Sequence, residues 1–280
     1  MKKFIAVLFL FYGVIFAQEK DSTLYQWQPS LATGLNISQI AFSNWTQGGE
    51  NSITWTLTGD FALQYNMELW AFKNQIKAAY GRTKQGGKDF ITNDNELYLE
   101  TLLSYQVLDW KVNPFFSNTL RTQLTSGYDY KTSPEKKISD FFDPGYITQS
   151  LGFTYNHLEA FQTRLGIALQ EVIADQFREY TDDPLTPDEI EAFKFETGFE
   201  SVSDFKYKLD KNLLIKTKLR LFTRFESMKV WDVRWDNVIT AKINSWLNVN
   251  CTYLLIYQQD QSPTAQMKQG LQLGAVYTII

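Results

Sequence analysis

The sequence predicts an all-β fold, a single antiparallel transmembrane β-barrel of about twelve strands with short periplasmic turns and long extracellular loops. Three observations support this prediction. The N-terminal segment is typical of an exported protein, apolar and polar residues alternate over long stretches, and the connections between those stretches alternate between long and short. Alternation with period two is the pattern of a strand whose two faces meet different surroundings.

Residues 1–17 predict a secretory signal peptide. Lys2 and Lys3 precede an uncharged apolar run that ends in the small residue Ala17, after which we expect cleavage. The run is shorter than the roughly 20 apolar residues of a transmembrane helix, and no later stretch supplies them. Residues 18–30 are expected to be a periplasmic N-terminal segment, and residues 31–280 the barrel.

Long period-two stretches predict the strands. From Ile53 to Tyr65 apolar residues occupy most odd positions, while Thr, Asp and Gln occupy most even ones. Globular strands typically have about 5 or 6 residues, whereas about 9 to 11 tilted residues cross a membrane, so these lengths favour a barrel over a soluble sandwich. The expected strands are 31–42, 53–65, 70–80, 97–107, 112–124, 147–155, 161–169, 195–199, 213–221, 233–243, 249–257 and 271–279.

The connections predict two different rims. Long segments such as "TSGYDYKTSPEKKISDFFDPG" alternate with tight turns such as "NMEL" and "LDKN". Outer-membrane barrels combine short periplasmic turns with longer extracellular loops. We therefore expect both termini on the short-turn side, a location in the bacterial outer membrane, and outer-membrane lipid and the barrel-insertion machinery as partners.

The charge balance argues against nucleic acid as a partner. The formal net charge is −4, and it becomes more negative without Lys2 and Lys3. Binding to phosphate backbones requires a basic surface.

Segments spread over the expected barrel resemble a Bacteroidota family of unknown function that is predicted to form outer-membrane barrels. The segments are "SQIAFSNWTQGGENS", "YGRTKQGG", "TSGYDY", "KISDFFDPGYITQSLGFTY" and "DVRWDNVITAKINSWLNVN". The resemblance implies fold and location, and it supplies no established catalytic residues.

The motif "FSNWTQGGENS" is expected to form the first extracellular hairpin. Its glycines suit the positive φ values of a tight turn, and its tryptophan suits the interfacial girdle. We interpret it as a structured rim element that could also contact a ligand. The candidate residues of this motif are Asn44, Trp45, Gln47, Gly48, Gly49, Glu50 and Asn51.

The polar face of the strands is expected to line the lumen. The charges on this face can neutralise one another and plug a small barrel, or they can border a narrow water-filled pore. An open pore with opposed charges would favour small polar or zwitterionic solutes. A structural barrel that acts through its loops is the alternative. The lumen-facing candidates are Asp60, Lys73, Lys77, Glu96, Glu100, Arg121, Arg164, Glu196, Glu200, Asp204, Lys216, Lys218, Arg220, Arg224, Asp232, Arg234, Asp236 and Lys242.

Other chemistry has weak support in the sequence. The only histidine, His157, is expected in a short periplasmic turn, where a lipase triad facing the outer leaflet would not be, so we expect no catalytic residues. One histidine and one cysteine do not make a transition-metal site, and no cofactor is expected.

The acidic segment "DQFREYTDDPLTPDEIEAF" could bind calcium, although its spacing favours a solvated loop, and a short helix is expected from Thr186 to Phe193. Four rim aromatics, Tyr128, Tyr130, Phe141 and Phe142, could form a lid or an interfacial anchor.

Overall fold

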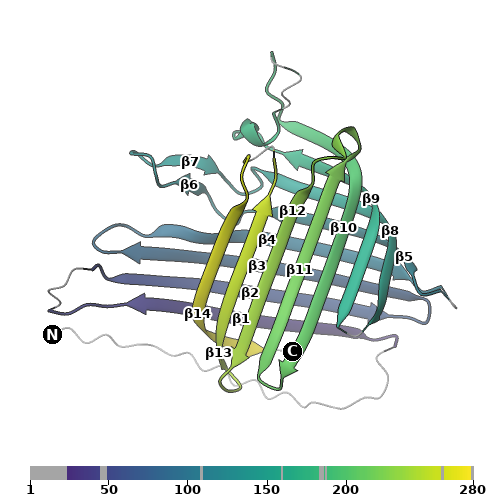
Figure 1. Cartoon of the computed structure of the whole chain (residues 1–280), viewed down its shortest axis with the longest axis horizontal. Helices are drawn as coiled ribbons and strands as arrows, with labels where there is room; N and C mark the ends of the chain where they lie inside the picture. The colour runs from purple at the N-terminus through teal and green to yellow at the C-terminus, as the bar shows by residue number, and fades with distance from the viewer. Residues whose placement is uncertain are drawn as a thin grey trace.

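The chain forms a closed barrel of twelve antiparallel strands (Figure 1). The computed structural model describes residues 24–44, 49–107, 110–158, 160–182, 186, 188–259 and 262–278, without the side chain of His157. The predicted signal peptide and the first part of the predicted periplasmic segment lie outside the described residues. Within the described part of the chain, no helix has the length and hydropathy needed to cross a bilayer.

Each predicted stretch overlaps one strand of the barrel, so the prediction of about twelve strands is confirmed. The barrel strands have 10 to 18 residues. The strands are β1 (Trp27–Ile40), β2 (Ser52–Asn66), β3 (Trp70–Gln85), β4 (Ile91–Tyr105), β5 (Asn113–Thr122), β8 (Gly145–Leu158), β9 (Phe161–Ile173), β10 (Phe193–Asp210), β11 (Leu213–Arg224), β12 (Asp232–Lys242), β13 (Leu247–Tyr257) and β14 (Gln266–Thr278).

Neighbours in the chain pair with one another, and β1 pairs with β14 to close the barrel. The lengths of these pairings differ. β1 pairs with β2 along its whole length, from Trp27 to Ile40, but within the described part of β14 it pairs only from Ala32 to Ile37. Figure 1 shows β10 to β13 crossing β1 to β4 on the opposite wall at a steep angle. A closed barrel pairs its backbone groups between strands, as a bilayer interior requires.

The connections lie on two rims, as predicted, although segment 86–90 of the long-loop rim is shorter than segment 106–112 of the short-turn rim. The long-loop rim carries segments 41–51, 86–90, 123–144, 174–192, 225–231 and 258–265, and the short-turn rim carries segments 67–69, 106–112, 159–160, 211–212 and 243–246. The long-loop rim also holds a small hairpin of β6 (Gly127–Asp129) and β7 (Lys136–Ser139), and the 3-10 turns η1 (Arg178–Tyr180) and η2 (Phe225–Ser227).

Two local predictions are wrong. The described residues 188–192 contain no helix, because the end of this segment makes hydrogen bonds to Ala174 and Thr181 instead. The Ala174 amide donates to the Ala192 carbonyl at 2.9 Å, and the Thr181 hydroxyl donates to the Glu191 carbonyl at 2.5 Å. The backbone of His157 lies in the last residues of β8 instead of a turn, because β8 runs to Leu158 before the chain reverses.

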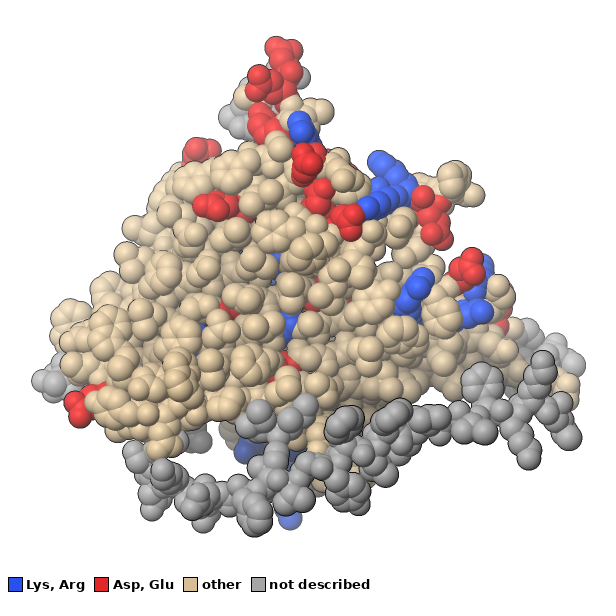
Figure 2. All heavy atoms as spheres, turned by 180° about the vertical axis from the view of Figure 1, so that it is seen from behind, with Lys and Arg blue, Asp and Glu red and all other residues tan. Residues whose placement is uncertain are grey.

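The wall has an apolar exterior and a polar interior. On β8 the outward Leu151 and Phe153 are exposed, while the inward Ser150 and Thr154 are buried. A soluble sandwich would bury the apolar face. Figure 2 shows an outer wall almost free of charged side chains, with Asp, Glu, Lys and Arg gathered mainly at one end, over the long loops.

Aromatic side chains cluster on the outside near the short-turn rim. Trp27 lies against Tyr65 with ring centroids 4.6 Å apart, and Trp70 lies against Tyr105 at 4.8 Å. Such rings favour the membrane–water interface because they combine an apolar body with a polar group. They mark the boundary of the bilayer on this side.

Glycines allow a close approach of strands along one side of the lumen. Gly152 and Gly166 face each other on β8 and β9. A Cβ on Gly152 would stand 2.1 Å from the Leu165 carbonyl oxygen, so a side chain cannot fit without backbone movement. Because these glycines have no side chains, the lumen beside them has room for longer side chains from neighbouring positions.

Candidate functional site

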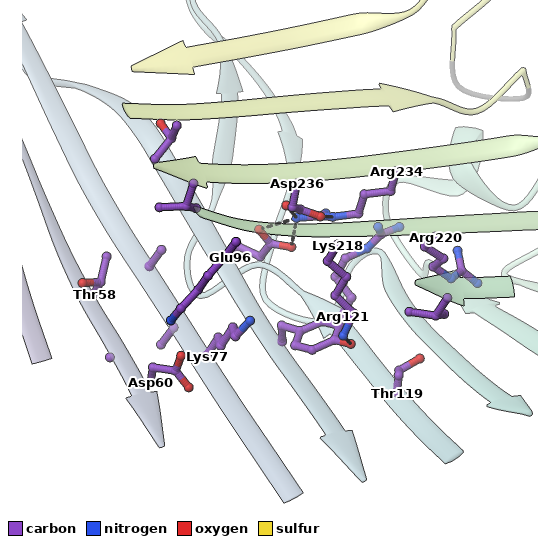
Figure 3. A pocket seen from close by; sticks show the side chains of 18 of the residues that line it. Thr58, Asp60, Lys77, Glu96, Thr119, Arg121, Lys218, Arg220, Arg234 and Asp236 are labelled. Atoms are coloured by element: carbon purple, nitrogen blue, oxygen red, sulfur yellow. Dashed lines mark hydrogen bonds and ion pairs between the residues drawn. The ribbon is translucent and has the colours of Figure 1, made fainter. Parts of the chain in front are cut away.

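The lumen contains a cavity of about 440 Å³ (Figure 3). Its lining includes Arg164 and Gln170 on β9, six positions apart, which corresponds to roughly 20 Å along a strand. Tyr146 and Arg121 lie toward its long-loop end, and Lys216 toward its short-turn end. The cavity therefore follows much of the height of the barrel.

The structure brings most of the predicted lumen residues to this cavity. Eleven of the eighteen line it: Asp60, Lys77, Glu96, Arg121, Arg164, Glu200, Lys216, Lys218, Arg220, Arg234 and Asp236. Glu100, Glu196, Arg224 and Asp232 form ion pairs in the inner wall beside it. Lys73, Asp204 and Lys242 are not part of its lining, and they continue the same alternation toward the short-turn rim.

A buried carboxylate, Glu100 on β4, lies at the centre of the charged wall. It accepts a hydrogen bond from Lys218 Nζ at 2.8 Å and contacts the Arg164 guanidinium. Lys218 also donates to the Tyr98 hydroxyl at 3.0 Å. These contacts join β4, β9 and β11, which are not neighbours in the sheet, so they tie opposite parts of the wall together.

Three further ion-pair groups extend this wall toward the long-loop rim. Each consists of one arginine paired with one or two carboxylates, a geometry that stabilises charges out of bulk water. The pairs are Arg220–Glu200 at 2.6 Å, Arg224–Glu196 at 2.5 Å, Arg224–Asp232 at 3.1 Å, Arg234–Glu96 at 2.8 Å and Arg234–Asp236 at 2.8 Å. Figure 3 shows Glu96, Arg234 and Asp236 meeting at the edge of the cavity.

The opposite wall is polar and, among the described residues that line the cavity, Asp60 on β2 is its one charged side chain. Strands β1, β2, β13 and β14 present small hydroxyl and amide side chains to the cavity, and Asn250 Nδ2 donates to Asn36 Oδ1 at 2.9 Å. The cavity residues from this wall include Asn36, Thr58, Asn250, Thr252 and Gln272. The lumen therefore has one face of fixed charges and one neutral face that can exchange hydrogen bonds with water or a solute.

Sequence reasoning missed this neutral face because it selected charged residues only. It also missed Lys206, Tyr98 and the pair between Lys268 and Asp94, whose Nζ and Oδ1 atoms lie 2.9 Å apart. All of them sit at inward positions of the alternation. Following the polar parity to the ends of the strands would have found them.

The first long loop is a structured rim element in its described part. Asn51 accepts a hydrogen bond from the Phe42 amide at 2.6 Å, and its carbonyl accepts one from the Gly86 amide at 2.7 Å. Asn44 and Gly49 have φ values of 54° and 128°. A Cβ on Gly49 would stand 2.7 Å from the Phe42 ring, so the chain packs closely here. Glu50 lies beside Gly86, and Trp45, Gln47 and Gly48 lie outside the described residues.

The acidic loop is attached to the barrel by Asp143. Its carboxylate accepts hydrogen bonds from the amides of Asp175 and Gln176, both at 3.0 Å. Across the described residues, no three Asp, Glu, His or Cys side chains converge as a metal site would require. The described contacts that hold this loop include these hydrogen bonds from its backbone amides to the Asp143 carboxylate.

The rim aromatics form two pairs. Tyr128 and Tyr130 are 6.2 Å apart, and so are Phe141 and Phe142. The Tyr130 hydroxyl accepts a hydrogen bond from the Thr92 amide at 2.9 Å, which fastens the β6–β7 hairpin to β4. Beside them, Lys137 and the Phe141 amide hydrogen-bond Asp140 and lower the pKa of its carboxyl below the ordinary value.

A closed barrel with an apolar outer wall, an interfacial aromatic cluster and a polar, partly hollow lumen defines a transmembrane β-barrel. A family model described as "Protein of unknown function (DUF3078)" matches residues 37–128, which include β2 to β5. Among curated proteins, none matches the sequence.

Several solved structures resemble the chain at low sequence identity. The translocator domain of the autotransporter NalP from Neisseria meningitidis is 10% identical, with 89% of this chain and 87% of that chain covered and a TM-score of 0.38. An outer membrane channel from Pseudomonas putida F1 is 9% identical, with 94% and 98% covered and a TM-score of 0.40. The KdgM porin is 7% identical, with 89% and 97% covered and a TM-score of 0.28.

Proposed function

We propose that this protein is a channel of the bacterial outer membrane for small polar solutes. The observation that carries the proposal is the cavity of about 440 Å³ beside the neutral face of the lumen. Most cations of the charged face are held in ion pairs, so these side chains have little freedom to move into the open space. A solute on the neutral face would meet amide and hydroxyl groups that can replace its hydrating water.

The proposal assigns no catalytic role to the chain and implies outer-membrane lipid and the insertion machinery as its partners. The competing function is a non-conducting barrel that acts through its extracellular loops. The two functions differ in whether the lumen passes solute, because the loop function requires no transport.

Planar-bilayer recording on the refolded protein tests the proposal. We expect stepwise conductance from preparations whose folded state is verified by heat-modifiable migration on gels. A Thr58→Trp variant places a bulky ring in the cavity and should lower the unit conductance. Leu57→Trp is the matched control, because Leu57 is the neighbouring residue on the exposed outer face. Folded protein that never conducts would leave the loop function as the better account.

A further inference from the structure

Five lysines lie on inward positions near the short-turn end of the lumen: Lys73, Lys77, Lys206, Lys216 and Lys242. We propose that this lysine ring is an anion-binding vestibule, and that the solutes of the channel are small anions bearing carboxylate or phosphate groups. The solute class rests on the proposed channel function, whereas the binding of anions does not.

The lysines belong to strands from both sides of the barrel. Lys206 on β10 stands directly opposite Lys216 on β11 in the strand register. The charges that act on Lys216 most strongly are those of Lys206, Asp60, Lys77 and Lys242. Like charges directly opposite each other are destabilising, so an anion between them would relieve repulsion that the fold otherwise retains.

The lysine ring differs from the other cations of the lumen in its lack of partners. Arg164, Lys218, Arg220, Arg224 and Arg234 each lie within ion-pair distance of a carboxylate. In the described part of the chain, none of the five ring lysines does. All five side chains are exposed, which inside a barrel means exposed to lumen water.

The acidic groups at this end are too few to neutralise the ring. Asp60 stands opposite Lys77 in the register and already accepts a hydrogen bond from Gln75 Nε2 at 2.8 Å. Asp204 stands opposite Lys218 in the register, and Lys218 forms its ion pair with Glu100. Among the described strand residues that stand beside the ring in the register, two aspartates therefore face five lysines, and the ring carries an excess of positive charge.

The cavity continues this positive character away from the ring. Lys77 and Lys216 line its short-turn end, and Arg121 lines the other end. The Arg121 guanidinium lies over the Tyr146 ring at 4.8 Å, and among the described residues no carboxylate lies within ion-pair distance of it. Figure 3 shows Lys77 and Arg121 both projecting into the open space. An anion leaving the ring can thus move toward a second cation.

A first experiment measures anion binding without conduction. The folded full-length barrel is heated in detergent, in sodium phosphate or in sodium chloride at equal ionic strength, and the loss of heat-modifiable migration gives Tm. We expect phosphate to raise Tm for the wild type, and the triple variant Lys206→Gln, Lys216→Gln, Lys242→Gln to lose that shift. Equal shifts in both proteins would mean that phosphate acts on the surface generally and would overturn the vestibule.

A second experiment measures ion selectivity from the reversal potential in a potassium chloride gradient. We expect chloride to permeate in preference to potassium. The triple variant should lower that preference by at least about threefold, because the interaction energy between one lysine charge and a permeating ion is roughly RT at such distances, even after screening by salt. The matched control is Lys88→Gln, Lys131→Gln, Lys136→Gln, which removes the same charge from the long-loop rim.

The two failures are distinguishable. Conducting channels whose selectivity is the same in the wild type and the triple variant would overturn the anionic solute class and leave the channel standing. Absence of conductance would instead remove the proposed function, and the phosphate-dependent Tm would then decide whether the ring binds anions.

Discussion

Replacing Glu100 by Gln removes the carboxylate shared by Arg164 and Lys218. The perturbation is nearly isosteric, so packing is preserved and the effect is electrostatic. The Glu100 side chain is only 9% exposed, and those of Arg164 and Lys218 are 6% and 20% exposed. Two cations would then lie close together in a mostly buried site, with none of the described carboxylates within ion-pair distance of either.

Breaking a buried ion pair by removing one partner costs about 3–5 kcal/mol. We expect Glu100→Gln to lower the free energy of unfolding by about that amount. The comparison variant is Asp236→Asn, because Asp236 is 37% exposed and an exposed pair contributes only about 1 kcal/mol or less. The two variants have the same change in charge and differ chiefly in the burial of the group removed.

Unfolding of the barrel in lipid vesicles by urea, followed by tryptophan fluorescence, measures both variants. A triple variant, Glu100→Leu, Arg164→Met, Lys218→Met, should recover most of the loss, because it removes all three charges together. If Glu100→Gln and Asp236→Asn shift the midpoint equally, or if the triple variant is no more stable than Glu100→Gln, the account of a buried, mutually dependent cluster is refuted.

Two further outcomes follow from the strand packing and the rim. Gly152→Ala should lower the free energy of unfolding by about 1–3 kcal/mol, since its Cβ would overlap the Leu165 carbonyl, whereas Gly87→Ala, with open space around it, should have no effect in the same unfolding assay. The lowered pKa of Asp140 means that its contribution to hairpin order is complete above the ordinary Asp pKa and is lost as pH falls through the lower folded value. The protection factors of the β6 and β7 amides, which correct for the slower intrinsic exchange of amides in acid, should therefore fall at acid pH in the wild type, and Asp140→Asn should show low protection without that dependence.

The alternation of the sequence was sufficient to predict the strands and the face that each side chain occupies. Glu200 and Arg220 lie on adjacent strands, so the order of the hairpins was enough to predict that these two side chains lie close together. The contact between Arg164 on β9 and Glu100 on β4 could not be predicted in this way, since it depends on how the barrel closes and how strongly its strands tilt.

The loops were less predictable because tertiary contacts override local preferences. The segment after Thr186 has a proline and acidic residues suited to a helix start, yet its described part forms a turn and is then held by hydrogen bonds to Ala174 and Thr181. The same alternation rule would have predicted the neutral wall if it had been applied to uncharged residues, and it would have predicted Lys206 if it had been followed along the full length of β10.

The short pairing of β1 with β14 gives the wall a line of least mechanical strength. Among the described residues, β1 is held to β2 over fourteen positions but to β14 over six, from Ala32 opposite Thr278 to Ile37 opposite Leu273. This contact also joins the two ends of the chain, so it carries the largest loop-closure cost and forms late in assembly. Under heat or pulling force the cylinder should unzip along this line first, beginning at the long-loop end, where β14 is bonded on one side only.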